Sequence, residues 1–130
     1  MKSKDGVISI PFYNLPVSAG PGEYLEDSTH SSINIRAEGR AAEASFALKV
    51  SGESMEPRFS DGDIILVKEQ NSVSAGQFGV FVCDGTGYFK QYQQDRLVSI
   101  NPSYADIPLS SFEDVSCKGL VLGRLKSKKH

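Results

Sequence analysis

Short apolar runs separated by polar turns follow one another along most of the chain. Hydrophobic and polar residues alternate in residues 33–36 and 45–50, and a period of two is typical of β-strands with one buried face. Residues 96–100 are also strand-like. Residues 64–67 are continuously apolar, which predicts a strand buried on both faces. Residues 115–125 carry a further apolar run, and we expect one or two closing strands there.

A hairpin is the clearest local element. Residues 78–83 and 88–92 are strand-like and flank the turn Asp84-Gly85-Thr86-Gly87. Helical periodicity is nearly absent; residues 37–44 favour a helical turn or two, which Gly39 keeps short. The pattern therefore predicts a mainly β fold, with several short strands in a partly closed, barrel-like or sandwich arrangement.

The segment 10–25 has a different character, because it holds three of the six prolines. Their spacing argues against a helix and favours extended backbone. Ala19-Gly20, near its centre, is small on both sides of the peptide bond, so a protease groove could accept the segment by strand addition. An ordinary Gly/Pro loop is the alternative interpretation.

Composition adds limits. With 130 residues, 39% of them hydrophobic and 23% charged, the chain is expected to be one soluble globular domain. The net charge of −2 gives no overall basic surface for nucleic acid. No apolar run reaches 18 residues and no signal peptide is evident. We expect a cytoplasmic protein without a membrane segment, metal or cofactor, in which Cys83 and Cys117 are free thiols rather than a disulfide.

The most reactive arrangement centres on Ser54. It lies on a bend after Gly52, between a predicted strand and Pro57, where a hydroxyl can be presented on a rigid edge. Neither histidine is close in sequence, but Lys90 sits among aromatic residues in a predicted strand. A lysine that loses solvent has a depressed pKa and can act as general base for a serine nucleophile.

That role has an energetic cost. Lowering a lysine pKa from about 10.4 to about 7 requires on the order of 4–5 kcal/mol, which burial can supply. Strand alternation puts Tyr88 and Tyr92 on the same face as Lys90, where the two rings would exclude water. Taken separately, a solvated strand lysine and a polar turn serine are the simpler interpretations of Lys90 and Ser54.

Several motifs together resemble the LexA/UmuD/phage-repressor family of self-cleaving Ser-Lys peptidases, over about residues 10–125. They occur in the family's order: Val17-Ser18-Ala19-Gly20, Ser51-Gly52-Glu53-Ser54-Met55, Asp61-Gly62-Asp63, and Lys90 in an aromatic strand. The resemblance implies that Ser54 is the nucleophile and Lys90 the base, and that the Ala19-Gly20 bond is cut. It also implies that the backbone N–H groups of Glu53 and Ser54 bind the oxyanion.

The resemblance further implies a homodimer, and cleavage stimulated by a RecA–single-stranded-DNA filament in the SOS response to DNA damage. It divides the chain into a linker (1–9), a cleavage-site segment with its connector (10–32) and a Ser-Lys peptidase-like domain (33–130). We expect the C-terminal domain of a repressor that contacts DNA only through an absent N-terminal domain. The alternatives are a UmuD-like subunit of an error-prone polymerase and a non-catalytic dimerisation module; type I signal peptidases are similar around the serine but work at a membrane.

Overall fold

The protein is described by a computed structural model that covers residues 6–13 and 31–125. Within these ranges it is mainly β, with two short 3₁₀ turns, η2 (Gly39–Glu43) and η3 (Leu109–Ser111). The strands found there are β1 (Val7–Tyr13), β2 (Ser31–Arg36), β3 (Phe46–Lys49), β4 (Ile64–Glu69), β5 (Phe78–Cys83), β6 (Thr86–Tyr92), β7 (Arg96–Val98), β8 (Ile107–Pro108) and β9 (Val115–Arg124).

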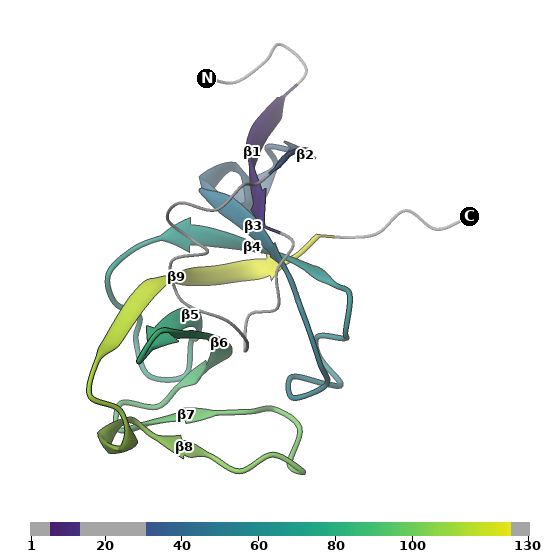
Figure 1. Cartoon of the computed structure of the whole chain (residues 1–130). Helices are drawn as coiled ribbons and strands as arrows, with labels where there is room; N and C mark the ends of the chain where they lie inside the picture. Colours follow the sequence, from purple (N-terminus) through teal and green to yellow (C-terminus); the bar gives the residue numbers. More distant parts are fainter. Residues whose placement is uncertain (1–5, 14–30, 126–130) are drawn as a thin grey trace.

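The described strands form one mixed sheet in the order β2-β1-β3-β4-β9-β5-β6-β7-β8. Among these strands only β1 and β3 pair in parallel, and the other neighbours are antiparallel. Figure 1 shows β1 and β2 at one end of the molecule and β7 and β8 at the other, with β9 crossing between them. The predicted mainly β class is confirmed.

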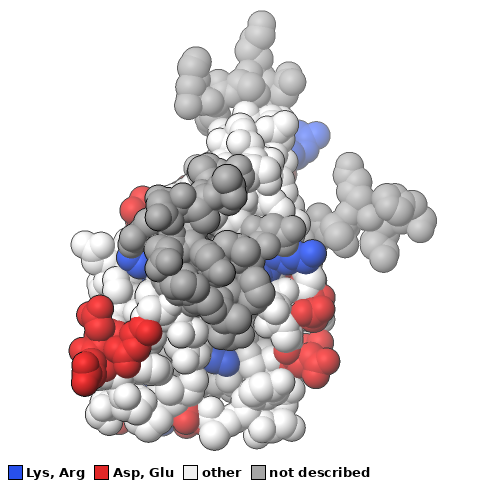
Figure 2. Space-filling view, viewed as in Figure 1, with Lys and Arg blue, Asp and Glu red and all other residues white. Residues whose placement is uncertain are grey.

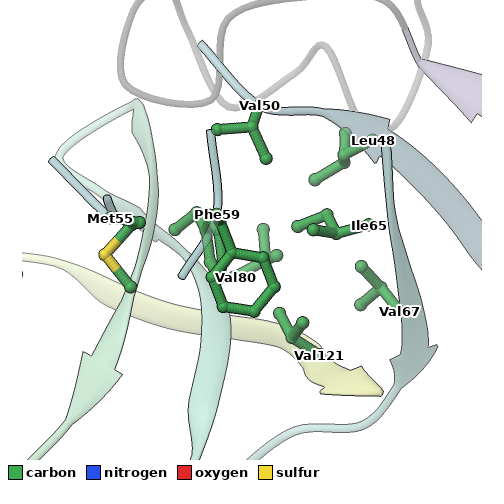
Figure 3. Packing of buried hydrophobic residues seen from close by; sticks show 9 residues of the cluster. Leu48, Val50, Met55, Phe59, Ile65, Val67, Val80 and Val121 are labelled. Carbon is green, nitrogen blue, oxygen red and sulfur yellow. The ribbon is translucent and has the colours of Figure 1, made fainter. Parts of the chain in front are cut away.

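The central strand β4 is buried on both faces, as its unbroken apolar run predicts. Ile65 and Val67 are 0% exposed and belong to one hydrophobic cluster, whereas Leu66 belongs to another. Figure 3 shows Leu48, Ile65 and Val67 directed toward Phe59 and Val80. Side chains alternate across a strand, so β4 supplies two cores at once. A third cluster is formed around Phe81 and Cys83 of β5 and Leu97 of β7.

The predicted hairpin is confirmed, and its turn is tighter than the four residues expected. β5 pairs with β6 from Phe78↔Gln91 to Cys83↔Thr86, which leaves only Asp84 and Gly85 in the turn. Both have positive φ, 50° and 86°. Two such residues match the twist of a right-handed hairpin, and Asp-Gly is a preferred pair for them.

Two sequence-based boundaries need correction. Residues 7–9, expected to belong to the linker, are part of β1, and residues 31–32, expected to belong to the connector, are part of β2. The reason is mutual pairing: Val7 lies opposite Arg36 and Phe12 opposite Ser31. Neither segment alternates strongly enough alone to predict the other. The helical turns expected in residues 37–44 are a single 3₁₀ turn, η2.

Both cysteines are free thiols in the structure, as expected. Burial, reinforced by the Asp84 and Asp114 carboxylates, raises the pKa of the Cys83 thiol to about 11. Cys83 is 1% exposed, so we regard it as a packing residue. No helix among the described residues is long and apolar enough to cross a membrane.

Strand β9 is long enough to pair with β5 along its first half and with β4 along its second. Gly119 sits where the two pairings overlap, opposite Val80 on one side and Glu69 on the other. A Cβ built on Gly119 would lie 2.5 Å from Val67 Cγ1 and 2.6 Å from the Lys68 carbonyl oxygen. Glycine is therefore needed here for close backbone approach.

We predict that Gly119→Ala lowers the free energy of unfolding by about 3 kcal/mol, because the new methyl group overpacks against backbone that cannot move aside. Gly76→Ala is the matched control: Gly76 has φ 91° but open space around its Cα, so only the conformational cost of about 1 kcal/mol applies. Urea unfolding measures both variants. Equal losses would show that the contact at Gly119 is unimportant.

Candidate active site

Ser54 lies in a loop, residues 51–63, that joins β3 to β4 and that we call the serine loop. Its two ends are tied together: Val50 N–H donates to Asp63 O at 2.7 Å, and Gly62 N–H donates to Val50 O at 2.9 Å. Gly52, with φ 91°, donates its N–H to Asp61 Oδ1 at 2.7 Å. The Gly52 turn and the Asp61-Gly62-Asp63 turn therefore brace each other, and the loop is held as a rigid unit.

Apolar side chains fix this loop on the sheet. Met55 and Phe59 are 2% and 4% exposed and belong to the same cluster as β4, and both reach into it in Figure 3. The ring of Phe59 meets that of Phe89 edge-on, with centroids 4.9 Å apart, a favourable aromatic geometry. Met55 therefore packs in the core, and this contact fixes the position of Ser54, the residue before it in sequence.

The structure brings Lys90 and Ser54 together from 36 residues apart. Lys90 is 6% exposed, and its Nζ lies 2.8 Å from Ser54 Oγ. The same nitrogen donates a hydrogen bond to Ser99 Oγ, also at 2.8 Å. This second contact follows from strand register: β6 pairs with β7 as Gln91↔Val98 and Tyr92↔Leu97, so one step further along the register sets Ser99 beside Lys90.

Lys90 is buried without an opposite charge. In the part of the chain that the structure describes, Lys90 forms no ion pair with a carboxylate. Burial therefore lowers the pKa of the Lys90 amine from its ordinary 10.5. Its nearby groups are two hydroxyls and the ring of Tyr104, whose centroid lies 5.8 Å from Nζ. Burial favours the neutral amine, which a general base requires.

The two tyrosines that were expected to shield Lys90 have other aromatic partners. Tyr92 stacks on Phe81 at 6.0 Å between centroids, and Tyr88 packs against Phe112 at 5.7 Å. Both belong to the periphery of the cluster around Leu97. The two tyrosines thus pack in the cluster next to Lys90. The ring that lies beside Lys90 Nζ is that of Tyr104.

Asn101, just beyond β7, grips the serine loop at two points. Its backbone N–H donates to Ser54 O at 2.9 Å, and its side-chain Nδ2 donates to Glu53 O at 3.0 Å. Neither the Glu53 N–H nor the Ser54 N–H donates to another group within residues 6–13 and 31–125. Two such backbone donors beside a serine hydroxyl could bind an oxyanion.

Sequence reasoning missed three residues of this site: Ser99, Asn101 and Tyr104. The pattern of residues 101–103, Asn-Pro-Ser, predicts only a turn. The register between β6 and β7 is the signal that would have found Ser99, and the sequence alone does not specify it. Ala19 and Gly20 lie outside the described residues. No cluster of three or more His, Cys, Asp or Glu side chains that could hold a metal occurs in the described part.

The lowered pKa of Lys90 predicts how stability depends on pH. Between that lowered pKa and the ordinary 10.5, the unfolded chain holds a proton that the folded chain lacks, so stability increases with pH across this interval. One such group contributes a slope of up to about 1.4 kcal/mol per pH unit. Lys90→Met removes the contribution. We expect urea unfolding from neutral pH to 10.5 to show a smaller rise for Lys90→Met than for the wild type; parallel curves would contradict the burial argument.

Comparison with known proteins gives consistent matches. The profile of the family described as Peptidase S24-like matches residues 11–122. The chain is 30% identical to the LexA repressor of Syntrophomonas wolfei subsp. wolfei over 112 residues, which cover 85% of this chain and 55% of that repressor.

Two other LexA repressors are similar to the chain. That of Thermotoga petrophila is 34% identical over 105 residues (78% of this chain, 52% of the repressor). That of Finegoldia magna is 31% identical over 103 residues (78% and 48%). The chain thus spans about half the length of the curated relatives that it matches.

Proposed function

Because the chain belongs to the Peptidase S24-like family, we propose that it is the self-cleaving C-terminal domain of a LexA/phage-type repressor and cuts its own Ala19-Gly20 bond. One observation carries the proposal: a buried amine, with no carboxylate partner among residues 6–13 and 31–125, lies 2.8 Å from a serine hydroxyl. The relatives named above are LexA repressors, which favours a repressor over a UmuD-like polymerase subunit.

In the proposed reaction, neutral Lys90 takes the proton of Ser54 as Oγ attacks the carbonyl carbon of Ala19. The resulting tetrahedral oxyanion is bound by backbone N–H groups at Glu53 and Ser54. Its collapse breaks the bond to the Gly20 nitrogen, which receives the proton from the Lys90 ammonium group. Water then attacks the Ser54 ester as Lys90 takes its proton. Collapse of this second intermediate breaks the bond to Ser54 Oγ, which receives the proton back from Lys90, and the Ala19 carboxyl group is released.

Ser99 supports this use of Lys90. A neutral amine has one lone pair and two N–H donors. When Ser99 Oγ accepts one N–H, at 2.8 Å, the amine loses rotational freedom, and its lone pair can be directed at the Ser54 hydroxyl. The absence of a carboxylate partner in the described part of the chain matters as much, because a nearby negative charge would stabilise the ammonium form, which cannot act as a base.

We predict that the purified chain, held at about pH 10, near the unperturbed lysine pKa, releases a fragment that begins at Gly20. Ser54→Ala and Lys90→Ala should each stop its release, because a nucleophile or its base is lost; removal of a general base alone costs about 10²–10⁴-fold in rate. Mass spectrometry identifies the new termini, and gel densitometry gives the rate.

Matched controls lie close by. Ser51→Ala removes an exposed serine of the same loop, and Lys49→Ala removes an exposed lysine at the end of β3; both should cut at the wild-type rate. A Gly20 fragment that forms undiminished in Lys90→Ala would refute the base assignment. Failure of the wild type to cut at any pH from 7 to about 10.5 would favour the non-catalytic dimerisation module.

DNA contact is assigned, within this proposal, to a further N-terminal domain. The face seen in Figure 2 has Asp and Glu side chains gathered at two sides, with Lys and Arg side chains scattered singly. The whole chain carries a net charge of −2. Neither feature suits the phosphate backbone, which attracts continuous basic surfaces. Stimulation by a RecA–single-stranded-DNA filament follows from the family resemblance and stays a prediction.

We also propose that the domain forms a homodimer. Strand β9 pairs with β5 only as far as Leu120, so in the described part of the chain the edge of residues 121–124 that faces away from β4 has no strand partner. An unpaired strand edge is open to pairing with a second chain. We expect sedimentation equilibrium to give twice the 14.1 kDa of one chain; a single-chain mass at micromolar concentration would contradict it.

A further inference from the structure

Asn101 has a more specific relation to Ser54 than a turn residue requires. All four of its hydrogen-bonding groups are engaged, including the carbonyl, which accepts the Tyr104 N–H at 3.1 Å. The backbone N–H donates to Ser54 O at 2.9 Å, Nδ2 donates to Glu53 O at 3.0 Å, and Oδ1 accepts the Ser103 N–H at 2.9 Å.

These partners define which way the Asn101 amide points. The Ser103 N–H can only donate and the Glu53 carbonyl can only accept, so the side-chain oxygen must face Ser103 and the nitrogen must face Glu53. An aspartate could satisfy Ser103 but would set a carboxylate oxygen against the Glu53 carbonyl. An alanine would satisfy neither. The position therefore requires a short side chain that both donates and accepts.

Holding the Glu53 carbonyl also holds the N–H of Ser54. The two groups belong to one planar peptide unit, and in a trans peptide they point in opposite directions. Among the described residues the only cis bond is Glu56-Pro57, so the Glu53-Ser54 peptide is trans. While Nδ2 of Asn101 engages the Glu53 oxygen, the Ser54 N–H must point away from Asn101. That N–H donates to no other group in the described ranges.

We infer that Asn101 is a positioning residue for the oxyanion hole: by gripping the Glu53 carbonyl, it aims the Ser54 N–H at the developing oxyanion. The inference rests on the proposed function, because it assigns the Ser54 N–H to that reaction. Asn101 itself touches no reacting atom. The Glu56 N–H also donates to the Glu53 carbonyl, at 3.1 Å, so without the Asn101 side chain the Glu53-Ser54 peptide keeps only this longer hydrogen bond and its orientation is less well fixed. An oxyanion donor that must first be reoriented contributes less to catalysis.

The same short segment also serves the base. Ser99, two residues before Asn101, accepts a hydrogen bond from Lys90, so residues 99–101 contact the base and the nucleophile's loop together. The two effects are separable in experiment. Loss of the Asn101 side chain should lower the rate of self-cleavage without changing the titration of Lys90. The reason is that this side chain forms hydrogen bonds with Glu53 and Ser103 and none with the Lys90 amine.

The test compares Asn101→Ala with Ser103→Ala. The second change removes a neighbouring side chain but keeps the backbone N–H of residue 103, which donates a hydrogen bond to Asn101 Oδ1. We expect Asn101→Ala to lower the plateau rate of self-cleavage at high pH by about ten- to a hundredfold, a fraction of the effect of deleting an oxyanion donor outright. The pH of half-maximal rate should stay at the wild-type value. Ser103→Ala should match the wild type in both, and thermal unfolding checks that both variants fold.

A second readout does not need the Ala19-Gly20 bond in the site. Phosphonylation of Ser54 by a fluorophosphonate, followed by mass spectrometry, also forms a tetrahedral centre whose oxygen uses the oxyanion donors. We expect Asn101→Ala to slow it by a similar factor. A wild-type rate for Asn101→Ala in both assays would overturn the inference and leave the proposed function intact.

The two proposals can fail separately. If the wild-type chain does not cut itself but its Ser54 is phosphonylated, the self-cleavage proposal fails, and slower labelling of Asn101→Ala still supports the positioning role. If the wild-type chain neither cuts itself nor becomes phosphonylated at Ser54, both proposals fail. A shifted pH of half-maximal rate in Asn101→Ala would also overturn the inference, because it would mean that Asn101 acts through Lys90.

Discussion

The site depends on one buried amine that has hydroxyl groups, and no carboxylate in the described part of the chain, as hydrogen-bonding partners. Lys90 is 6% exposed and lies 2.8 Å from both Ser54 Oγ and Ser99 Oγ. An isolated buried charge is among the most costly things a fold can hold, and the usual outcome is that the group becomes neutral. For a lysine, the neutral form is the one with a lone pair. Burial, which is usually a penalty, thus supplies the neutral amine that the proposed reaction uses as its base.

The hydrophobic clusters of the sheet offset the free-energy cost of burying Lys90. β4 supplies two hydrophobic clusters, with Ile65 and Val67 fully buried on one side and Leu66 on the other. The serine loop is attached to the first cluster through Met55 and Phe59, and the β5–β6 hairpin is attached to it through Val80 and Phe89. Ser54 and Lys90 are therefore carried by two elements packed on the same core. Their separation is fixed by that packing, and close-packed interiors resist changes of even one methylene.

The donors of the proposed oxyanion hole are backbone groups, which explains why the residues that support them are easily overlooked. In our inference Asn101 acts by orienting the Glu53-Ser54 peptide plane, which contains no atom of Asn101. Glu53, whose side chain is exposed, matters for its carbonyl and its N–H rather than for its carboxylate. Such roles leave little trace in residue type, since a turn asparagine is common for local reasons as well.

The sequence by itself determined the elements whose signals are local. Short alternating or apolar runs predicted most of the described strands, and the continuous run 64–67 predicted a doubly buried one. Asp84-Gly85 predicted a hairpin turn, and the motif around Ser54 with Lys90 predicted which two side chains should meet. Only the tertiary structure decided three further features. They are the pairing of Val7–Tyr13 with Ser31–Arg36, the register that sets Ser99 beside Lys90, and the hydrogen bonds from Asn101 to the serine loop, 47 to 48 residues away in sequence. The physical reason is that register and loop docking are chosen by packing between distant segments, and a pattern of period two is compatible with several registers until a shared core selects one.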